Sequence, residues 1–237
     1  MIEIKALIPV GVKAFFISSA MQNPQIPGLE LPVRTIYCIG RNYADHAKEL
    51  KNAVPTSPVV FIKPVGTICY NDAEISLPPE SKEVHFEAEL VVAISKSGKN
   101  IPTFSALDYV AGYGVGIDFT ARDFQQAAKE KGLPWAIAKG FDQFAPISDF
   151  IKAKEIENPN NLDLKLFLNS FIKQHGNTSE MIFPVDYLIS FLSTIFTLHP
   201  GDLIFTGTPS GVGPVKSGDR LEVMLENGII TLTVKIG

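Results

Sequence analysis

The chain has 237 residues, of which 46% are hydrophobic and 19% charged, a balance that excludes a disordered chain and favours one folded domain with a sizeable core. The net charge of −4 provides no basic surface for nucleic acid or an anionic membrane, and no apolar run approaches the roughly 20 residues that span a bilayer. The two cysteines, Cys38 and Cys69, lie in apolar runs, which predicts buried thiols in a reducing cytoplasm and no disulfide.

The first 32 residues are predicted to be a short extension ahead of a main domain at 33–237. Residues 6–20 faintly resemble a signal peptide, but proline, glycine and lysine interrupt the apolar run, so a folded strand or hairpin is the better interpretation. The segment 23–32 is rich in proline and glycine and is typical of a linker.

The main domain is predicted to begin with a strand at 33–39 and a short polar helix at 43–51. On that helix His46 and Glu49 are three residues apart, so their side chains share a face. A second strand, at 58–64, follows and ends at a proline.

Residues 83–95, EVHFEAELVVAIS, are predicted to form a strand whose apolar side chains alternate onto one face. His85, Glu87 and Glu89 then share the other face. Carboxylates two residues apart on a strand have Cα atoms about 6.5–7 Å apart. Both can therefore turn onto one cation at about 2.1 Å per oxygen. The ordinary alternative is a solvated strand face, where most glutamates lie.

A third carboxylate favours the metal site. Residues 108–132 predict a strand that runs into a helix, with Asp118 at the junction and Thr120 and Asp123 as a capping box at the helix start. An acid at such a junction is well placed to meet the two glutamates across a sheet. An all-oxygen set suits a hard cation, with Mg²⁺ first and Mn²⁺ or Ca²⁺ behind.

The remaining elements indicate one domain of the α+β class that is mostly β. Lys139 lies in an apolar run, and its ordinary interpretation is an ammonium that reaches the surface. A hairpin is predicted around Asn169–Ser170, a helix at 184–198 with Ile195 in its buried stripe, and a closing hairpin around Asn227–Gly228.

Five motifs follow one another in the order GRNYADHAKE, FEAE, DFTARDFQ, LPWAIAKGFD and HPGDLIFTGTPSGVGPVKSGD. Together they make the chain resemble the fumarylacetoacetate hydrolase family, in particular its short acylpyruvate hydrolase or fumarylpyruvate hydrolase-like branch, over about residues 34–226. The resemblance implies a mixed β-sandwich roll with a few short helices, a homodimer and a Mg²⁺ or Mn²⁺ site. It also implies metal-dependent hydrolysis of a carbon–carbon bond in an acylpyruvate-type β-diketone acid, which releases pyruvate and a carboxylic acid.

The resemblance also implies roles for single residues. Glu87, Glu89 and Asp118 match metal ligands of the family. The metal would polarise the oxo groups of a bound 2-oxo acid. Three further residues match positions that hold the substrate, namely Arg122, Gln125 and Thr208.

The catalytic groups come from the same resemblance. His46 and Glu49 match a dyad on a lid helix that orders when substrate binds, and His46 would take a proton from the attacking water. Lys139 matches a lysine that would stabilise the charge of the leaving pyruvate enolate.

Three alternatives remain beside hydrolysis. Decarboxylation of oxaloacetate would use the metal and Lys139 without a water attack, and isomerisation of a dienoate dicarboxylate would use the same site. A non-enzymatic β-sandwich with a structural Ca²⁺ is the third. The pair of His46 and Glu49, together with Lys139, argues against that module because a structural Ca²⁺ site has no use for them.

Overall fold

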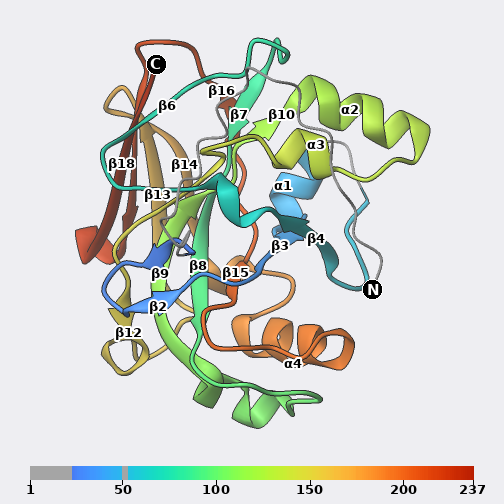
Figure 1. Cartoon of the computed structure of the whole chain (residues 1–237), viewed down its shortest axis with the longest axis vertical. Helices are drawn as coiled ribbons and strands as arrows, with labels where there is room; N and C mark the ends of the chain where they lie inside the picture. The colour runs from blue at the N-terminus through green and yellow to red at the C-terminus, as the bar shows by residue number, and fades with distance from the viewer. Residues whose placement is uncertain (1–22, 50–52) are drawn as a thin grey trace, which may run out of the picture.

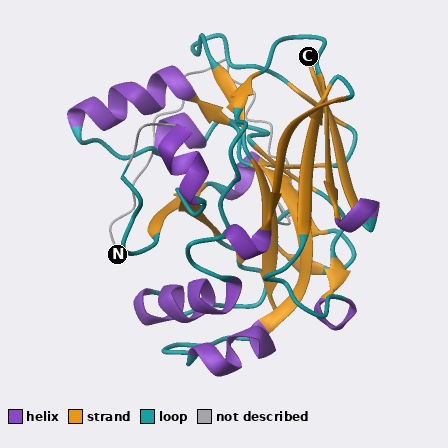
Figure 2. Cartoon of the chain, turned by 180° about the vertical axis from the view of Figure 1, so that it is seen from behind, coloured by secondary structure: helices purple, strands orange, loops and turns teal. Residues whose placement is uncertain are grey.

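The computed structural model describes residues 23–49 and 53–237, so the signal-peptide-like stretch at 6–20 lies outside the described residues. Two large β-sheets pack together, and the four α-helices lie along the far side of the larger sheet (Figures 1 and 2). This arrangement confirms the predicted mostly-β architecture with few helices. Within the described part of the chain, no helix is long and apolar enough to cross a membrane.

The larger sheet has eight strands and carries the centre of the fold. Most neighbours are antiparallel, whereas the second and third strands of the path run parallel, as do the last two. The strand β12 (Ile151–Lys152) pairs with β9 off the main path. The path is β4 (Val59–Lys63), β3 (Ile36–Gly40), β15 (Leu203–Phe205), β8 (Ala88–Ile94), β9 (Val110–Ile117), β11 (Ala145–Ile147) and β5 (Ile68–Tyr70), with β3 parallel to β15 and β11 parallel to β5.

The second of the two large sheets has five strands and contains both predicted hairpins. The turn at Asn169 and Ser170 has φ angles of 51° and 68°, the left-handed pair of a two-residue hairpin turn. The hairpin around Asn227–Gly228 is also present. The order is β14 (Phe171–Asn177), β13 (Asp163–Leu168), β17 (Arg220–Leu225), β18 (Ile230–Ile236) and β6 (Ala73–Ile75).

All seven residues of β8 are buried, because the large sheet is covered on both faces. Leu90 and Val92 belong to the core shared with the five-stranded sheet. Val91 and Ala93 belong to a second core on the opposite face. A strand covered on both sides has a nearly continuous hydrophobic sequence, and its buried ends provide rigid positions for functional side chains.

Helices α1, α2 and α3 lie beside β3 and β4, and α4 lies below them in Figure 1. The predicted helix at 184–198 is confirmed, but Ile195 is 52% exposed because it is the last helical residue. The α-helices are α1 (Ala44–Glu49), α2 (Arg122–Lys131), α3 (Ala136–Lys139) and α4 (Val185–Ile195). Short 3₁₀ turns are η1 (Val65–Thr67), η2 (Thr103–Tyr109), η3 (Ala153–Glu155), η4 (Thr178–Glu180) and η5 (Glu226–Gly228).

The strand predicted at 83–95 is broken at Glu87. Its first part belongs to a separate three-stranded sheet, and its second part is β8. The break turns Glu87 out of the regular ladder while Glu89 stays within it. The small sheet has the order β10 (Thr120–Ala121), β7 (Val84–Phe86) and β16 (Gly213–Pro214).

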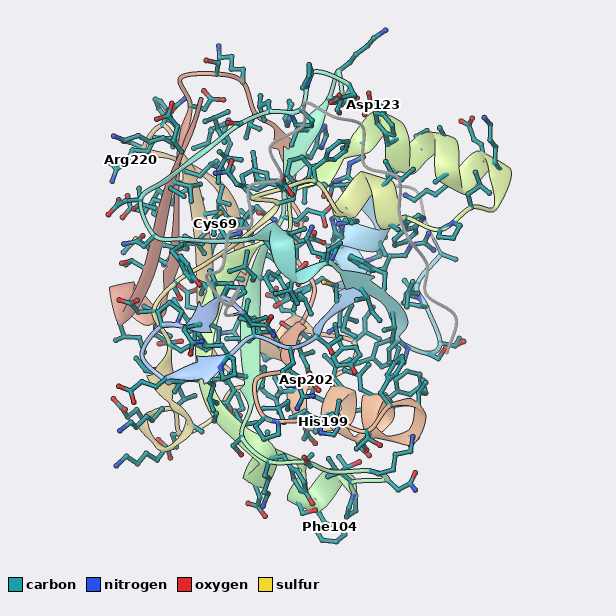
Figure 3. The ribbon with its side chains drawn as sticks, viewed as in Figure 1. Cys69, Phe104, Asp123, His199, Asp202 and Arg220 are labelled. Carbon is teal, nitrogen blue, oxygen red and sulfur yellow. The ribbon has the colours of Figure 1, made fainter. Side chains whose placement is uncertain are left out.

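Two local predictions were wrong. The segment 23–32 is not a free linker but a hairpin of β1 (Gln25–Ile26) and β2 (Leu31–Pro32), and the side chain of Ile26 is fully buried. The predicted capping box is absent, because Ala121 precedes the first turn of α2 without a capping side chain. Asp123, at the start of α2 (Figure 3), instead accepts hydrogen bonds from Ser81 and from the Lys82 amide.

Candidate active site

The three predicted carboxylates meet where β8 and β9 pair. Ala88 lies opposite Ile117 in this antiparallel ladder, so the residues just beyond them, Glu87 and Asp118, also face each other. The Asp118 amide donates to the Glu87 carbonyl at 2.8 Å. Carboxylate oxygens of Glu87, Glu89 and Asp118 lie within 4.8 Å of one another, and all three residues are buried. We call these three residues the carboxylate cluster.

Three cationic side chains neutralise part of this charge. Lys139 donates to both Glu87, at 2.9 Å, and Asp118. Lys63 Nζ lies 2.6 Å from Asp118 Oδ1, and Arg122 lies 2.6 Å from Glu87 Oε1. A buried carboxylate without such partners would be strongly destabilising. The surface position that a lone lysine ordinarily takes is therefore wrong for Lys139, whose exposed fraction is 2%.

The cations distribute the charge unevenly. Burial raises the pKa of Glu87, but the charges of Lys139 and Arg122 outweigh it and hold that pKa below its usual range. Burial lowers the pKa of Lys139, yet Asp118 and Glu87 reverse the effect and keep the ammonium charged. The ion pairs therefore fix Glu87 in its ionised form.

Glu89 is the member of the cluster that lacks a cationic partner within 4 Å among the described residues. Burial, followed by the charges of Asp118 and Glu87, raises its pKa well above the ordinary value. Its carboxylate accepts a hydrogen bond from the Gly207 amide at 2.6 Å. Gly207 has a φ of +97°, and a Cβ there would lie 2.6 Å from the Cβ of Asn42, so glycine allows this close approach.

The cluster fits a divalent cation on the chemistry of its donors. Three buried carboxylates supply hard oxygen ligands, and one of them, Glu89, has no positive side chain to answer its charge. Mg²⁺ and Mn²⁺ take such ligands at about 2.1 Å, a distance that small side-chain movements would reach.

The predicted dyad lies on α1. His46 Nδ1 is 3.2 Å from Glu49 Oε2, and His46 is buried beside the cavity that contains the carboxylate cluster. Glu49 Oε1 also accepts a hydrogen bond from the Gly211 amide at 3.1 Å. This second bond ties the end of α1 to the glycine-rich loop and orients the Glu49 carboxylate towards His46.

The predicted substrate residues also border the cavity. On α2, Arg122 donates to Gln125 Oε1 at 2.7 Å. The hydroxyl of Thr208 donates to the Ala88 carbonyl at 2.7 Å and accepts from Gln174. Thr208 therefore braces the backbone between the two glutamates as well as lining the cavity.

Sequence reasoning missed two residues that hold the site together. Lys63 ends β4 and is as buried as Lys139, and an apolar run ending in lysine is the signal that could have found it. Gln174, on β14, accepts from the Ala88 amide and donates to Thr208 and to the Pro209 carbonyl. Nothing in the local sequence marks it. His85, predicted on the same face as the glutamates, instead lies 2.7 Å from Glu83 and stays outside the cluster.

One cavity joins these groups. Its lining includes five cationic or potentially cationic side chains besides the acids. The lining residues are Ile39, Gly40, Arg41, His46, Phe61, Glu87, Glu89, Asp118, Arg122, Gln125, Lys129, Trp135, Lys139 and Thr208.

Comparison with known proteins places these features in a family. Residues 35–236 match the model of the fumarylacetoacetate (FAA) hydrolase C-terminal family. The chain is 50% identical over 190 residues to a mitochondrial oxaloacetate decarboxylase of Dictyostelium discoideum, covering 80% of this chain and 87% of that protein. It is 43% identical over 203 residues to a mitochondrial oxaloacetate tautomerase of Homo sapiens, covering 86% and 91%.

A solved structure shows the same fold. Fumarylpyruvate hydrolase from Pseudomonas aeruginosa, in complex with Mn²⁺ and pyruvate, aligns with a TM-score of 0.84 and 36% identity. The alignment covers 91% of this chain and 98% of that one.

Proposed function

The chain belongs to the fumarylacetoacetate hydrolase family, and from that premise we propose that it is a metal-dependent enzyme whose substrate is oxaloacetate. The reaction removes CO₂ from this acid or exchanges its keto and enol forms. Both curated relatives described above have names of oxaloacetate enzymes, which supports the alternative weighed from the sequence over acylpyruvate hydrolysis.

The observation that carries the proposal is the buried Lys139 ammonium between Glu87 and Asp118. In decarboxylation the C3–C4 bond breaks, its electron pair passes towards the 2-oxo oxygen, and C3 later takes a proton. In keto–enol exchange a base takes a proton from C3, a role for which His46 lines the cavity, and another proton joins the same oxygen. Negative charge develops on that oxygen in both reactions, and a fixed buried cation stabilises such charge strongly.

We propose that Glu87, Glu89 and Asp118 hold Mg²⁺ or Mn²⁺, which would act as a Lewis acid on the 2-oxo acid group. The Mn²⁺ named in the related hydrolase structure supports this choice of ions. The side chains of the cavity would do the rest. Arg122 and Gln125 would orient the 2-oxo acid, and Thr208 would contribute from the glycine-rich loop.

Acylpyruvate hydrolysis is the second candidate, and the pairing of His46 with Glu49 at 3.2 Å favours it. An imidazole held by a carboxylate is suited to take a proton from water. Such a base has no required part in the loss of CO₂. The name of the related fumarylpyruvate hydrolase supports this candidate as well.

The two candidates are separated by side-by-side assays on the metal-loaded protein. Oxaloacetate, acetylpyruvate and fumarylpyruvate are each followed by NMR, which resolves keto, enol and pyruvate signals, while released CO₂ is trapped. The proposal predicts that oxaloacetate is consumed or tautomerised faster than either acylpyruvate is cleaved. Rapid cleavage of an acylpyruvate with no effect on oxaloacetate would reject it in favour of hydrolysis.

We also propose that the chain forms a homodimer. The edge strand β4 and its neighbours expose large apolar side chains, which supports association. Light scattering is expected to give twice the chain mass of 25.9 kDa. A mass of one chain at micromolar concentration would contradict the proposal. The exposed residues in question are Ile62, Leu133, Ile137 and Ile195.

The cytoplasmic location remains a prediction. It rests on the two free cysteines, of which Cys38 is buried and Cys69 half-buried. The names of both curated relatives assign those proteins to mitochondria. Fractionation of cells that express the tagged chain would distinguish the two compartments.

A further inference from the structure

The outer part of the cavity contains two cations that the proposed chemistry does not use. Arg41 follows β3, and Lys129 lies on α2, so two separate elements bring them to one cavity. Both are half-buried, and both line the cavity together with the carboxylate cluster.

An aromatic wall connects these cations to the inner site. Arg41 Cζ lies 5.9 Å and Lys129 Nζ 5.6 Å from the centroid of the Trp135 ring. Trp135 packs edge-on against Phe61 at 5.6 Å, and Lys139 Nζ lies 4.9 Å from the centroid of the Phe61 ring. Cation–π attraction holds the heads of Arg41 and Lys129 beside the indole while leaving their hydrogen-bond donors available.

These outer cations differ from the inner ones in their partners. Lys63, Lys139 and Arg122 each pair with a carboxylate, whereas neither Arg41 nor Lys129 has one within 4 Å in the residues that the structure describes. Burial, and then the positive charges of Arg122 and Arg41, lower the pKa of Lys129. The mouth of the cavity therefore has a local positive charge that a bound anion would neutralise.

The backbone at Arg41 is also unusual. Its φ is +61°, in the left-handed region that costs a non-glycine residue free energy. The conformation directs the chain out of β3 so that the side chain of Arg41 reaches Trp135. Strain retained at the mouth of a cavity favours a functional use of that side chain.

We propose that Arg41 and Lys129 bind the distal carboxylate of a 2-oxo dicarboxylate whose 2-oxo acid end lies at the carboxylate cluster. This inference rests on the proposed function and deepens it by assigning the residues that recognise the second carboxylate. The charges of the site agree with it. The three acids equal the three inner cations in number, although Glu89 itself contacts none of them, so the divalent ion and the two outer cations leave a surplus positive charge that a dianion neutralises better than a monoanion.

The inference orders the candidate substrates. Oxaloacetate and fumarylpyruvate each have a distal carboxylate. Acetylpyruvate ends in a methyl group and would leave both outer cations without an anionic partner. A site that recognises a charged group discriminates against the analogue that lacks it, because its own buried charge is then left without a partner.

A binding experiment tests this without relying on turnover. Trp135 is the only tryptophan of the chain and touches both cations, so its fluorescence reports on the mouth of the cavity. The full-length, Mg²⁺-loaded protein is titrated with malate and with 2-hydroxybutanoate, which carries a methyl group in place of the distal carboxylate. Malate is expected to bind at least about tenfold more tightly, as one charge-assisted hydrogen bond would provide.

Variants assign the preference to the two side chains. Lys129→Met and Arg41→Gln are each expected to reduce the ratio of the two affinities about tenfold, because malate binding weakens much more than 2-hydroxybutanoate binding. Lys129→Arg should restore most of the ratio. Lys131→Met, an exposed lysine on the same helix that does not line the cavity, is the matched control and should keep the parental ratio.

Two outcomes overturn the inference. One is a parental protein that binds both acids equally, and the other is an unchanged ratio in both Lys129→Met and Arg41→Gln. Oxalate, which carries only the metal-binding end, tests the proposed function separately. If oxalate binds but malate has no advantage, the inference fails and the proposed function stands. If the loaded protein binds no oxalate, the proposed function fails, and the inference fails with it.

Discussion

The carboxylate cluster and helix α1, the predicted lid, face the same cavity but are built differently. Glu89 and Asp118 lie on or directly beyond β8 and β9, strands whose neighbours bury them almost completely. Helix α1 is six residues long, well below the length at which a helix holds in isolation. It is tied by Asn42, which bonds to the backbone of Phe183 and Thr206, and by the bond from Gly211 to Glu49.

This difference separates two kinds of chemistry. Charge stabilisation needs groups that do not move when the reaction occurs, and the cluster with Lys139 provides them. Water activation needs a base that is positioned with the substrate. His46 lies on α1, which is the less stable of the two regions. We therefore expect decarboxylation of oxaloacetate to depend chiefly on the cluster, and hydrolysis and keto–enol exchange, which both need a base, to depend on both regions.

Removal of one metal ligand should have the largest effect. Glu89→Gln keeps the shape of the side chain and strands no buried cation, because Glu89 has no cationic partner among the described residues. A bound Lewis acid contributes several kcal/mol, so turnover of oxaloacetate should fall about 10²–10³-fold or more. Chelation of the parent should do the same, and Mg²⁺ or Mn²⁺ should restore only the parent. Unchanged turnover after exhaustive chelation would show that the reaction does not require a metal ion.

Replacement of the buried lysine should come next. Lys139→Met is expected to reduce both oxaloacetate turnover and acylpyruvate cleavage about 10²–10³-fold, since both develop charge on the same oxygen. Lys131→Met serves as the exposed control on the neighbouring helix. Loss of only one of the two activities would show that Lys139 has a narrower role. A melting curve of the loaded protein checks that the variant is folded.

Metal affinity should depend on pH through Glu89. Burial and two neighbouring carboxylates raise its pKa above the ordinary 4.5, and a metal must displace the proton. Affinity measured by calorimetry should rise by up to about tenfold per pH unit below the raised pKa and level off above it. The metal-free fold should behave in the opposite way, because the folded state holds this proton more tightly, so that stability falls as pH rises towards the raised pKa. A metal affinity that ignores pH would contradict this assignment.

The smallest effect concerns the lid helix. Oxalate bound at the cluster should slow amide exchange in α1 (Ala44–Glu49) several-fold, and exchange in β8 should be unaffected because that strand is already protected. Mass spectrometry of peptides from both elements, with and without oxalate, makes the comparison. Equal exchange in α1 in both states would show that this helix is as fixed as the sheet.

The sequence predicted those parts of the site that follow from local patterns. Alternation placed Glu87 and Glu89 together, and a three-residue spacing paired His46 with Glu49. It did not predict the break of the strand at Glu87, because that break depends on pairing with two distant strands.

The groups that surround the site were harder to find for the same reason. Lys63 reaches Asp118 from 55 positions away, and Gln174 reaches Ala88 from 86 positions away. The first contact joins distant parts of the eight-stranded sheet, and the second joins the two large sheets. The sequence gives no spacing rule for them, so these residues became visible only in the fold.

The most direct test of the account measures two activities in one variant. His46→Ala removes the base on α1 and leaves the carboxylate cluster and Lys139 unchanged. We predict that acetylpyruvate cleavage falls at least about 10²-fold, the contribution of a general base, while decarboxylation of oxaloacetate keeps most of its parental rate. A variant that loses both activities equally, or that still cleaves acetylpyruvate at the parental rate, would contradict the division of labour between cluster and lid.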